Sequence, residues 1–264
     1  MVEFLKAWRR RRTLARHAVD PALWERVTSA LEFLDGMPAE DLARLYALVV
    51  EFLAQKQMHG AAEFELSDEV RLSIAVQACL PILNLGLEHY AGWVGIVVYP
   101  GEFRVRREEL DEDGVLHEWH DELSGEAWQG GPVVLSWEDV DTGEAGYNVV
   151  IHEFAHKLDM LSGDADGYPP APAGVDAREW HTTLERAFDR FCDEVERADR
   201  ATPAHRDTFE FDFDSYAAEH PAEFFAVMSE AFFTEPRHLR ERYPELYAAL
   251  GAFYRQDPAA RLLR

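Results

Sequence analysis

The pentapeptide His152-Glu153-Phe154-Ala155-His156 limits the folding of this chain more than any other stretch of its sequence. Its apolar neighbours, together with a capping Asn148 and a terminating Gly163, predict a buried helix from 149 to about 161. Residues four apart share one helix face, so both imidazoles can bind a single tetrahedral Zn²⁺, with Glu153 beside them to accept a proton from water. The pattern therefore predicts a catalytic zinc site on a helix.

A catalytic zinc needs a third protein ligand. Metzincins carry glycine and a third histidine where this chain has Asp159 and Ser162, so that class is excluded. We expect the ligand to be Glu223, because it lies in the most apolar helical stretch of the sequence, where an unpaired carboxylate is costly to bury. Glu219 and Glu230 are the competing candidates.

Three further side chains have spacings that suit a supporting role. Glu230 follows Glu223, and Asp159 follows His152, by two helical turns, so either carboxylate could hold the second ring nitrogen of a ligand histidine. Ordinary salt bridges or helix caps are the alternative. Tyr216 precedes Glu223 by the same interval, and its phenol could donate a hydrogen bond to a developing oxyanion, unless it is a buried structural tyrosine.

Hydrophobic periodicity predicts an α+β fold. Helical patterns occupy 20–34, 38–52, 67–80, 176–197 and 221–235, and β-branched or aromatic strands occupy 93–99, 103–105 and 133–137. A last aromatic stretch, 243–254, is expected to close the core. We expect a helical portion, 1–85, packed on a catalytic core, 86–264, that contains a small mixed sheet. The strand at 133–137 either offers its edge to an extended peptide substrate or is simply part of the core.

The composition limits which binding partners and which cellular compartment we expect for this protein. A formal charge of −24 argues against direct binding to nucleic acid or to an acidic membrane, and no apolar run is long enough for a membrane span. Cys79 and Cys192 form no CxxC pair, which indicates a reducing compartment and predicts a cytoplasmic protein. The basic segment 1–16, with Arg9 to Arg12, has no apolar run after it and is expected to be solvated or docked on the acidic body.

Four segments and a shorter fifth carry a more specific likeness that spans nearly the whole chain: 80–88 (LPILNLGLE), 131–137 (GPVVLSW), 150–160 (VIHEFAHKLDM), 221–230 (PAEFFAVMSE) and 253–258 (FYRQDP). In these segments the chain resembles the Mlc titration factor A family of zinc metallopeptidases. The resemblance implies one zinc ion held by His152, His156 and Glu223, with Glu153 as general base. It also implies a zincin-like core related to the anthrax lethal factor peptidase domain, in which a tyrosine matches Tyr216.

The same resemblance implies a cytosolic peptidase with aminopeptidase activity that binds the glucose-responsive repressor Mlc and so influences sugar uptake. The expected partners are therefore a peptide or protein substrate and a Mlc-like transcriptional repressor. Two other hypotheses stay open: a regulatory protein that titrates a repressor, with minor or vestigial peptidase activity, and a helical protein without a metal. Glu153 beside both histidines favours catalysis, because a structural metal site needs no base.

Overall fold

The computed structural model describes residues 12–14, 16–110, 116–140, 146–200 and 212–261. Most of the basic N-terminal segment lies outside these ranges. The sequence also predicts a turn at 111–114 and a loop at 199–214, and all of the first and most of the second lie outside the described residues as well. No helix among the described residues is both long and apolar enough to cross a membrane.

A mixed four-stranded sheet has the strand order β1-β2-β6-β5. Its strands are β1 (Gln57–Gly60), β2 (Gly95–Tyr99), β6 (Val133–Ser136) and β5 (Gly125–Ala127). β2 runs parallel to both β1 and β6, and β5 pairs antiparallel with β6. The two central strands match the predicted ones, and their alternate residues are fully buried. The sequence did not predict β1 or β5, and β1 extends the sheet into the portion 1–85.

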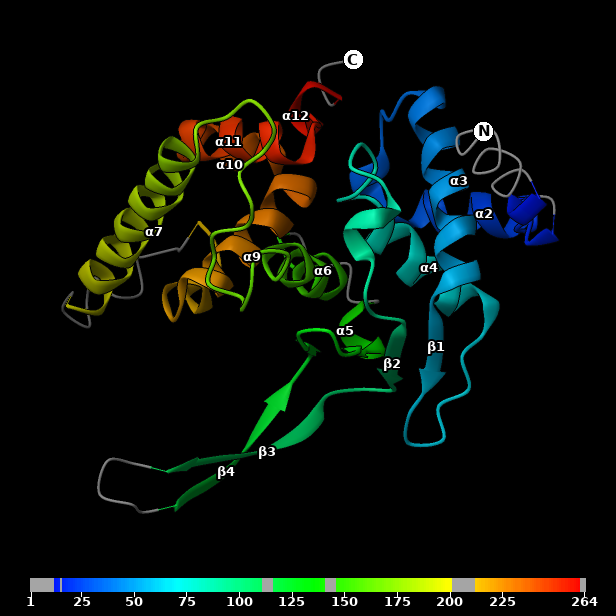
Figure 1. Ribbon diagram of the computed structural model, residues 1–264, viewed down its shortest axis with the longest axis horizontal. Coiled ribbons are helices and arrows are strands. Elements are labelled where there is room, and N and C mark those ends of the chain that lie inside the picture. The colour runs from blue at the N-terminus through cyan, green and yellow to red at the C-terminus, as the bar shows by residue number, and fades with distance from the viewer. Residues whose placement is uncertain (1–11, 15, 111–115, 141–145, 201–211, 262–264) are drawn as a thin grey trace.

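A second, two-stranded antiparallel sheet is formed by β3 (Phe103–Leu110) and β4 (Leu116–Leu123). Its register runs from Phe103 paired with Leu123 to Leu110 paired with Leu116. In Figure 1 this ribbon extends away from the helical body, and at its base Phe103 stacks on Tyr99 with ring centroids 5.0 Å apart.

Helices make up most of the remaining described structure. The α-helices are α2 (Pro21–Ala30), α3 (Ala39–Gln55), α4 (Asp68–Cys79), α5 (Trp137–Val140), α6 (Val149–Asp159), α7 (Ala177–Asp199), α9 (Pro221–Thr234), α10 (Pro236–Arg242), α11 (Pro244–Tyr254) and α12 (Pro258–Arg261), and the 3₁₀ turns are η1 (Glu32–Leu34), η2 (Leu87–Tyr90) and η3 (Ser215–Ala218). Ser67 caps α4 through a hydrogen bond from Val70 N. α9 ends at Thr234, and Pro236 begins the next helix, α10.

Helices α6 and α9 pack against each other at the centre of the molecule (Figure 1). On one side, Phe154 of α6 packs in an aromatic cluster with Phe52, Tyr90 and Trp93, at ring-centroid distances of 5.8, 5.0 and 5.7 Å. On the other side, α9 is buried along nearly its whole length. Both helices are therefore fixed by long-range packing. The observed architecture confirms the predicted α+β fold with a small mixed sheet.

The buried Lys56, at the end of α3, contacts two members of this aromatic cluster. Its ammonium donates hydrogen bonds to the carbonyl oxygens of Tyr90 and Trp93, at 2.5 and 2.6 Å, and lies 3.5 Å from the centroid of the Trp93 ring. Burial, followed by the nearby positive charge of Lys157, lowers the pKa of Lys56 to about 8.

We expect Lys56→Met to lower the free energy of unfolding by about 2 kcal/mol at pH 7, because two buried carbonyl groups lose their donor. Between about pH 8 and pH 10 the unfolded chain keeps the Lys56 proton that the folded chain releases, so raising the pH should stabilise the wild type relative to the variant. Urea unfolding of both proteins from pH 7 to 10 tests this. A stability difference that shrinks as the pH rises would contradict it.

Candidate metal centre

Helix α6 presents His152 and His156 on one face, as their spacing predicts. Asn148 caps the helix by accepting a hydrogen bond from Ile151 N at 2.8 Å, and its own amide donates to Gln77 Oε1 of α4 at 2.7 Å. The two imidazole rings have centroids 4.8 Å apart, and their Nε2 atoms are 3.2 Å apart. Both rings therefore direct a nitrogen at the same point.

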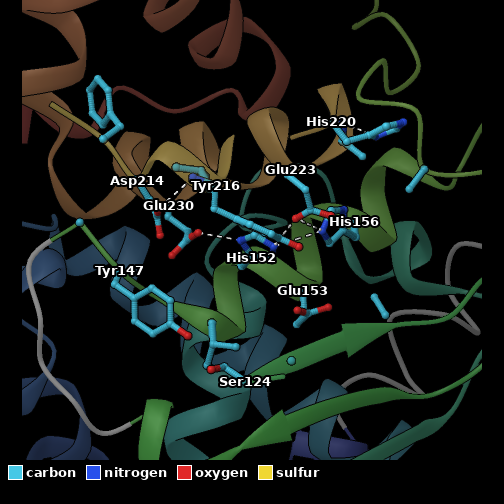
Figure 2. A pocket seen from close by; sticks show the side chains of 18 of the residues that line it. Ser124, Tyr147, His152, Glu153, His156, Asp214, Tyr216, His220, Glu223 and Glu230 are labelled. Atoms are coloured by element: carbon cyan, nitrogen blue, oxygen red, sulfur yellow. Dashed lines mark hydrogen bonds and ion pairs between the residues drawn. The ribbon is translucent and has the colours of Figure 1, made fainter. Parts of the chain in front are cut away.

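Helix α9 brings Glu223 to that point. Glu223 Oε2 lies 3.1 Å from His152 Nε2 and 3.4 Å from His156 Nε2 (Figure 2). Residues 152 and 223 are 71 positions apart, so only the packing of α6 on α9 joins them. Of the other two candidates, Glu219 is exposed and does not line the pocket, whereas Glu230 contacts the opposite nitrogen of His152.

The donor set fits a divalent cation. Its three ligand atoms lie within 4.8 Å of one another, and tetrahedral zinc with ligand bonds of about 2.1 Å places such atoms about 3.4 Å apart. The electrostatic environment of His152 also favours a bound cation. Burial opposes a charge on His152, but the hydrogen bonds to Glu223 and Glu230 outweigh it and hold the pKa of His152 well above its usual value. The cluster therefore stabilises positive charge at its centre.

Glu230 fixes the orientation of His152. Its Oε1 lies 2.7 Å from His152 Nδ1, and its Oε2 accepts a hydrogen bond from the backbone nitrogen of Asn148 at the start of α6. When Nδ1 donates to this carboxylate, the lone pair of Nε2 is left facing the cluster. Glu230 therefore occupies the position that its sequence spacing suggests for a carboxylate that supports a ligand histidine.

Asp159 does not contact either histidine through a hydrogen bond. Its Oδ2 accepts from the backbone nitrogen of Gly167 at 2.7 Å, while Oδ1 and His156 Nδ1 are both buried with no hydrogen-bond partner among the described residues. Gly167 has φ of +85° and packs against the start of α9, where a Cβ would lie 2.3 Å from the carbonyl oxygen of Pro221. Asp159 thus joins α6 to the loop that follows it and packs on the start of α9.

Glu153 lies on α6 beside the cluster and is only 4% exposed. Its Oε2 has no hydrogen-bond partner in the part of the chain that the structure describes. Burial raises the pKa of Glu153 to about 7, although the neighbouring imidazoles act in the opposite direction. A carboxyl group with a pKa near neutrality is suited to both accepting and returning a proton.

Tyr216 lies on η3 and is 42% exposed, which rules out the buried structural role that the sequence left open. Its ring centroid is 6.5 Å from that of His152, and Figure 2 shows the phenol directed toward His152 and Glu223. Asp214 supports the turn by accepting a hydrogen bond from Tyr216 N at 2.9 Å. The hydroxyl therefore lies beside the cluster of His152, His156 and Glu223.

The cluster opens into a pocket of about 680 Å³. β5 forms its wall through Gly125, Glu126 and Ala127, and one edge of this strand is unpaired in the four-stranded sheet. The strand at Val133–Trp137 does not offer an edge, because β6 is paired with β2 on one side and β5 on the other. Of the two alternatives that the sequence left open for this strand, the structure supports the second, in which it is part of the core.

Sequence reasoning also missed Ser124 and Tyr147, which line the pocket beside β5 (Figure 2). Burial raises the pKa of Tyr147 to about 12, although a side-chain hydrogen bond with Ser124 acts to lower it. No periodic signal marks either residue. The only available hint was that Tyr147 directly precedes the helix cap Asn148.

A buried HExxH helix, a glutamate from a second helix and a strand edge along one pocket define a metallopeptidase. A family model for glucose-regulated metallopeptidases, M90, matches residues 5–255. Proteins called Mlc titration factor A from Salmonella paratyphi B and Salmonella typhimurium are each 40% identical over 236 residues, which cover 88% of this chain and 86% of theirs. The one from Salmonella gallinarum is 39% identical over the same lengths. The chain belongs to the M90 family of metallopeptidases.

Proposed function

We propose that this protein is a zinc-dependent peptidase with aminopeptidase-like specificity, in which His152, His156 and Glu223 hold one zinc ion per chain. The convergence of three donor atoms from α6 and α9 within 4.8 Å is the observation that supports it. Cysteine, histidine and carboxylate side chains are the usual ligands of zinc, and two histidines with one glutamate are the ligand set of several hydrolytic zinc sites.

His152, His156 and Glu223 would hold a zinc ion that would supply a Lewis acid and make water nucleophilic near neutral pH. Glu153 accepts a proton from the attacking water at its carboxylate and passes it to the nitrogen of the leaving amine as the C–N bond breaks. Tyr216 donates a hydrogen bond to the oxyanion that develops on the scissile carbonyl. Glu230 keeps His152 in the tautomer that the site requires.

The substrate is proposed to bind as an extended strand along the free edge of β5, because backbone groups at that edge can pair with it. The described pocket lining contains no Lys or Arg but seven acidic residues, Glu126, Glu153, Asp212, Asp214, Glu223, Glu230 and Glu235. This lining favours substrates with a positive charge, such as the free α-amino group of a short peptide.

Removal of the metal tests the proposal. A chelator such as dipicolinate should abolish hydrolysis of aminoacyl chromogenic substrates, and added zinc should restore it. Free zinc at about 100 times its dissociation constant should also stabilise the fold by about 2.7 kcal/mol. Metal analysis should give one zinc per chain. Full activity in a protein that has been shown to lack metal would contradict the proposal.

A second proposal concerns a protein partner. The relatives named Mlc titration factor A are 40% identical to this chain over most of its length, and their name says that they titrate Mlc. We propose that a Mlc-like transcriptional repressor binds this protein and that the pair meets in the cytoplasm, where Cys79 and Cys192, both free, stay reduced. This binding could be the main output, with peptidase activity minor. Calorimetry with such a repressor, using wild type and Glu153→Gln, separates binding from catalysis.

A further inference from the structure

Strand β5 lies directly against the side chain of Glu153 at Gly125. A Cβ placed on residue 125 would lie 2.3 Å from Glu153 Oε1 and 2.7 Å from both Cδ and Cγ, where real Cβ contacts are essentially never below 3.0 Å. Gly125 is not among the glycines with positive φ, so its backbone would accept alanine without strain. What requires glycine here is the closeness of the strand to Glu153.

The strand is held at both ends to the helix that carries Glu153. At its start, Ser124 has a side-chain hydrogen bond with Tyr147, which immediately precedes the cap of α6, and the carbonyl oxygen of Ser124 accepts from Ser136 N at 2.7 Å. At its end, the buried ammonium of Lys157 on α6 donates to the carbonyl oxygens of Trp128 and of Gly131, the latter at 2.9 Å. Between these points β5 pairs with β6, so the strand has little freedom to move outward.

The carboxylate of Glu153 is held less firmly. Its Oε2 has no hydrogen-bond partner among the described residues, so packing rather than polar contacts defines its position. A methyl group added at residue 125 would therefore be accommodated mainly by displacement of the Glu153 carboxylate, because the carboxylate can move more easily than strand β5.

We propose that Gly125 is a positioning residue, whose missing side chain sets the place of the Glu153 carboxylate beside the metal cluster. This inference rests on the proposed peptidase function, in which Glu153 transfers the proton. Because a misplacement of about 1 Å at a reacting group can cost about 100-fold in rate, the effect of one methyl group should be large.

The test compares Gly125→Ala with Gly95→Ala, a glycine of β2 in the same sheet whose Cβ would make only ordinary contacts with Pro132, 3.5 Å from its Cβ and 4.0 Å from its Cα. We expect Gly125→Ala to lower kcat by about 10- to 100-fold, with KM and zinc content unchanged, and its crystal structure to show a displaced Glu153 carboxylate. Gly95→Ala should match the wild type. A raised KM with unchanged kcat, or activity equal to that of Gly95→Ala, would overturn the inference.

Glu153→Ala, alone and combined with Gly125→Ala, shows through which group the glycine acts. Alanine at 153 lacks the Cγ, Cδ and Oε1 atoms that a Cβ at residue 125 would meet, so Gly125→Ala should leave the melting temperature of Glu153→Ala unchanged. If Gly125→Ala lowers the melting temperature of Glu153→Ala, the added methyl group acts through the strand and the inference is wrong.

Failure of this inference is distinct from failure of the proposed function. If the wild type hydrolyses peptides and Glu153→Gln does not, the function stands whatever Gly125→Ala does. If Glu153→Gln is as active as the wild type, the peptidase mechanism itself is wrong, and the two glycine variants are then compared by crystallography alone.

Discussion

Replacement of Glu153 by glutamine is expected to reduce kcat for aminoacyl substrates by about 1,000-fold or more while leaving zinc bound. Glutamine has nearly the same shape as glutamate but cannot accept the proton, and proton transfer by a positioned side chain is worth about 100- to 10,000-fold. Glu153 contributes no atom to the group of three metal-binding side chains, so metal content should stay at one per chain. Steady-state kinetics together with metal analysis of the purified protein measures both quantities.

Glu219→Gln is the matched control for this experiment. It makes the same chemical change at an exposed position close to the pocket, and its kinetics should equal those of the wild type. Wild-type turnover in Glu153→Gln, with metal in place, would leave the repressor-binding hypothesis as the better account of this protein.

Glu223→Gln should weaken zinc binding by more than about 100-fold and abolish hydrolysis at ordinary zinc concentrations. Loss of a residue that only supports a ligand already costs about 10- to 100-fold in metal affinity, so loss of a ligand charge should cost more. Glu223 also faces two imidazoles, whose hydrogen bonds outweigh its burial and hold its pKa below the usual range, so the neutral amide removes the carboxylate that attracts the cation.

Competition titration with a zinc chelator gives the affinity of each variant, and Glu219→Gln again serves as the control. High zinc concentrations should restore part of the metal content of Glu223→Gln, and circular dichroism should show an unchanged helical fold. Unaltered zinc affinity in this variant would mean that a different side chain supplies the third ligand.

The local features of the centre could be read from the sequence. Apolar spacing, the Asn148 cap and the four-residue interval of the histidines are all properties of a single helix, so they predict α6 and the direction of His152 and His156. The apolar run around Glu223 likewise predicts α9 and marks a carboxylate that needs a partner.

Strand β5 could not be read in this way. Its three residues, Gly125–Ala127, are too few to show an alternating pattern, and none of them is a typical strand former. The longer and more hydrophobic stretch before α6 predicted a strand correctly, but a strand's own residues do not reveal whether both of its edges are paired. Pairing with β5 makes that strand internal and leaves β5, whose three residues line the pocket, at the end of the sheet.

The sequence by itself determined the HExxH helix, the apolar helix that follows later in the chain and the α+β class, because these depend on periodicities of a few residues. Only the tertiary structure decided that Glu223 rather than Glu219 or Glu230 completes the three-residue metal-binding cluster, and that Asp159 accepts a hydrogen bond from Gly167. Helical spacing fixes which residues share a face of one helix. Which of those faces meet is set by the long-range packing of α6, α9 and β5, and no short stretch of the chain contains that information.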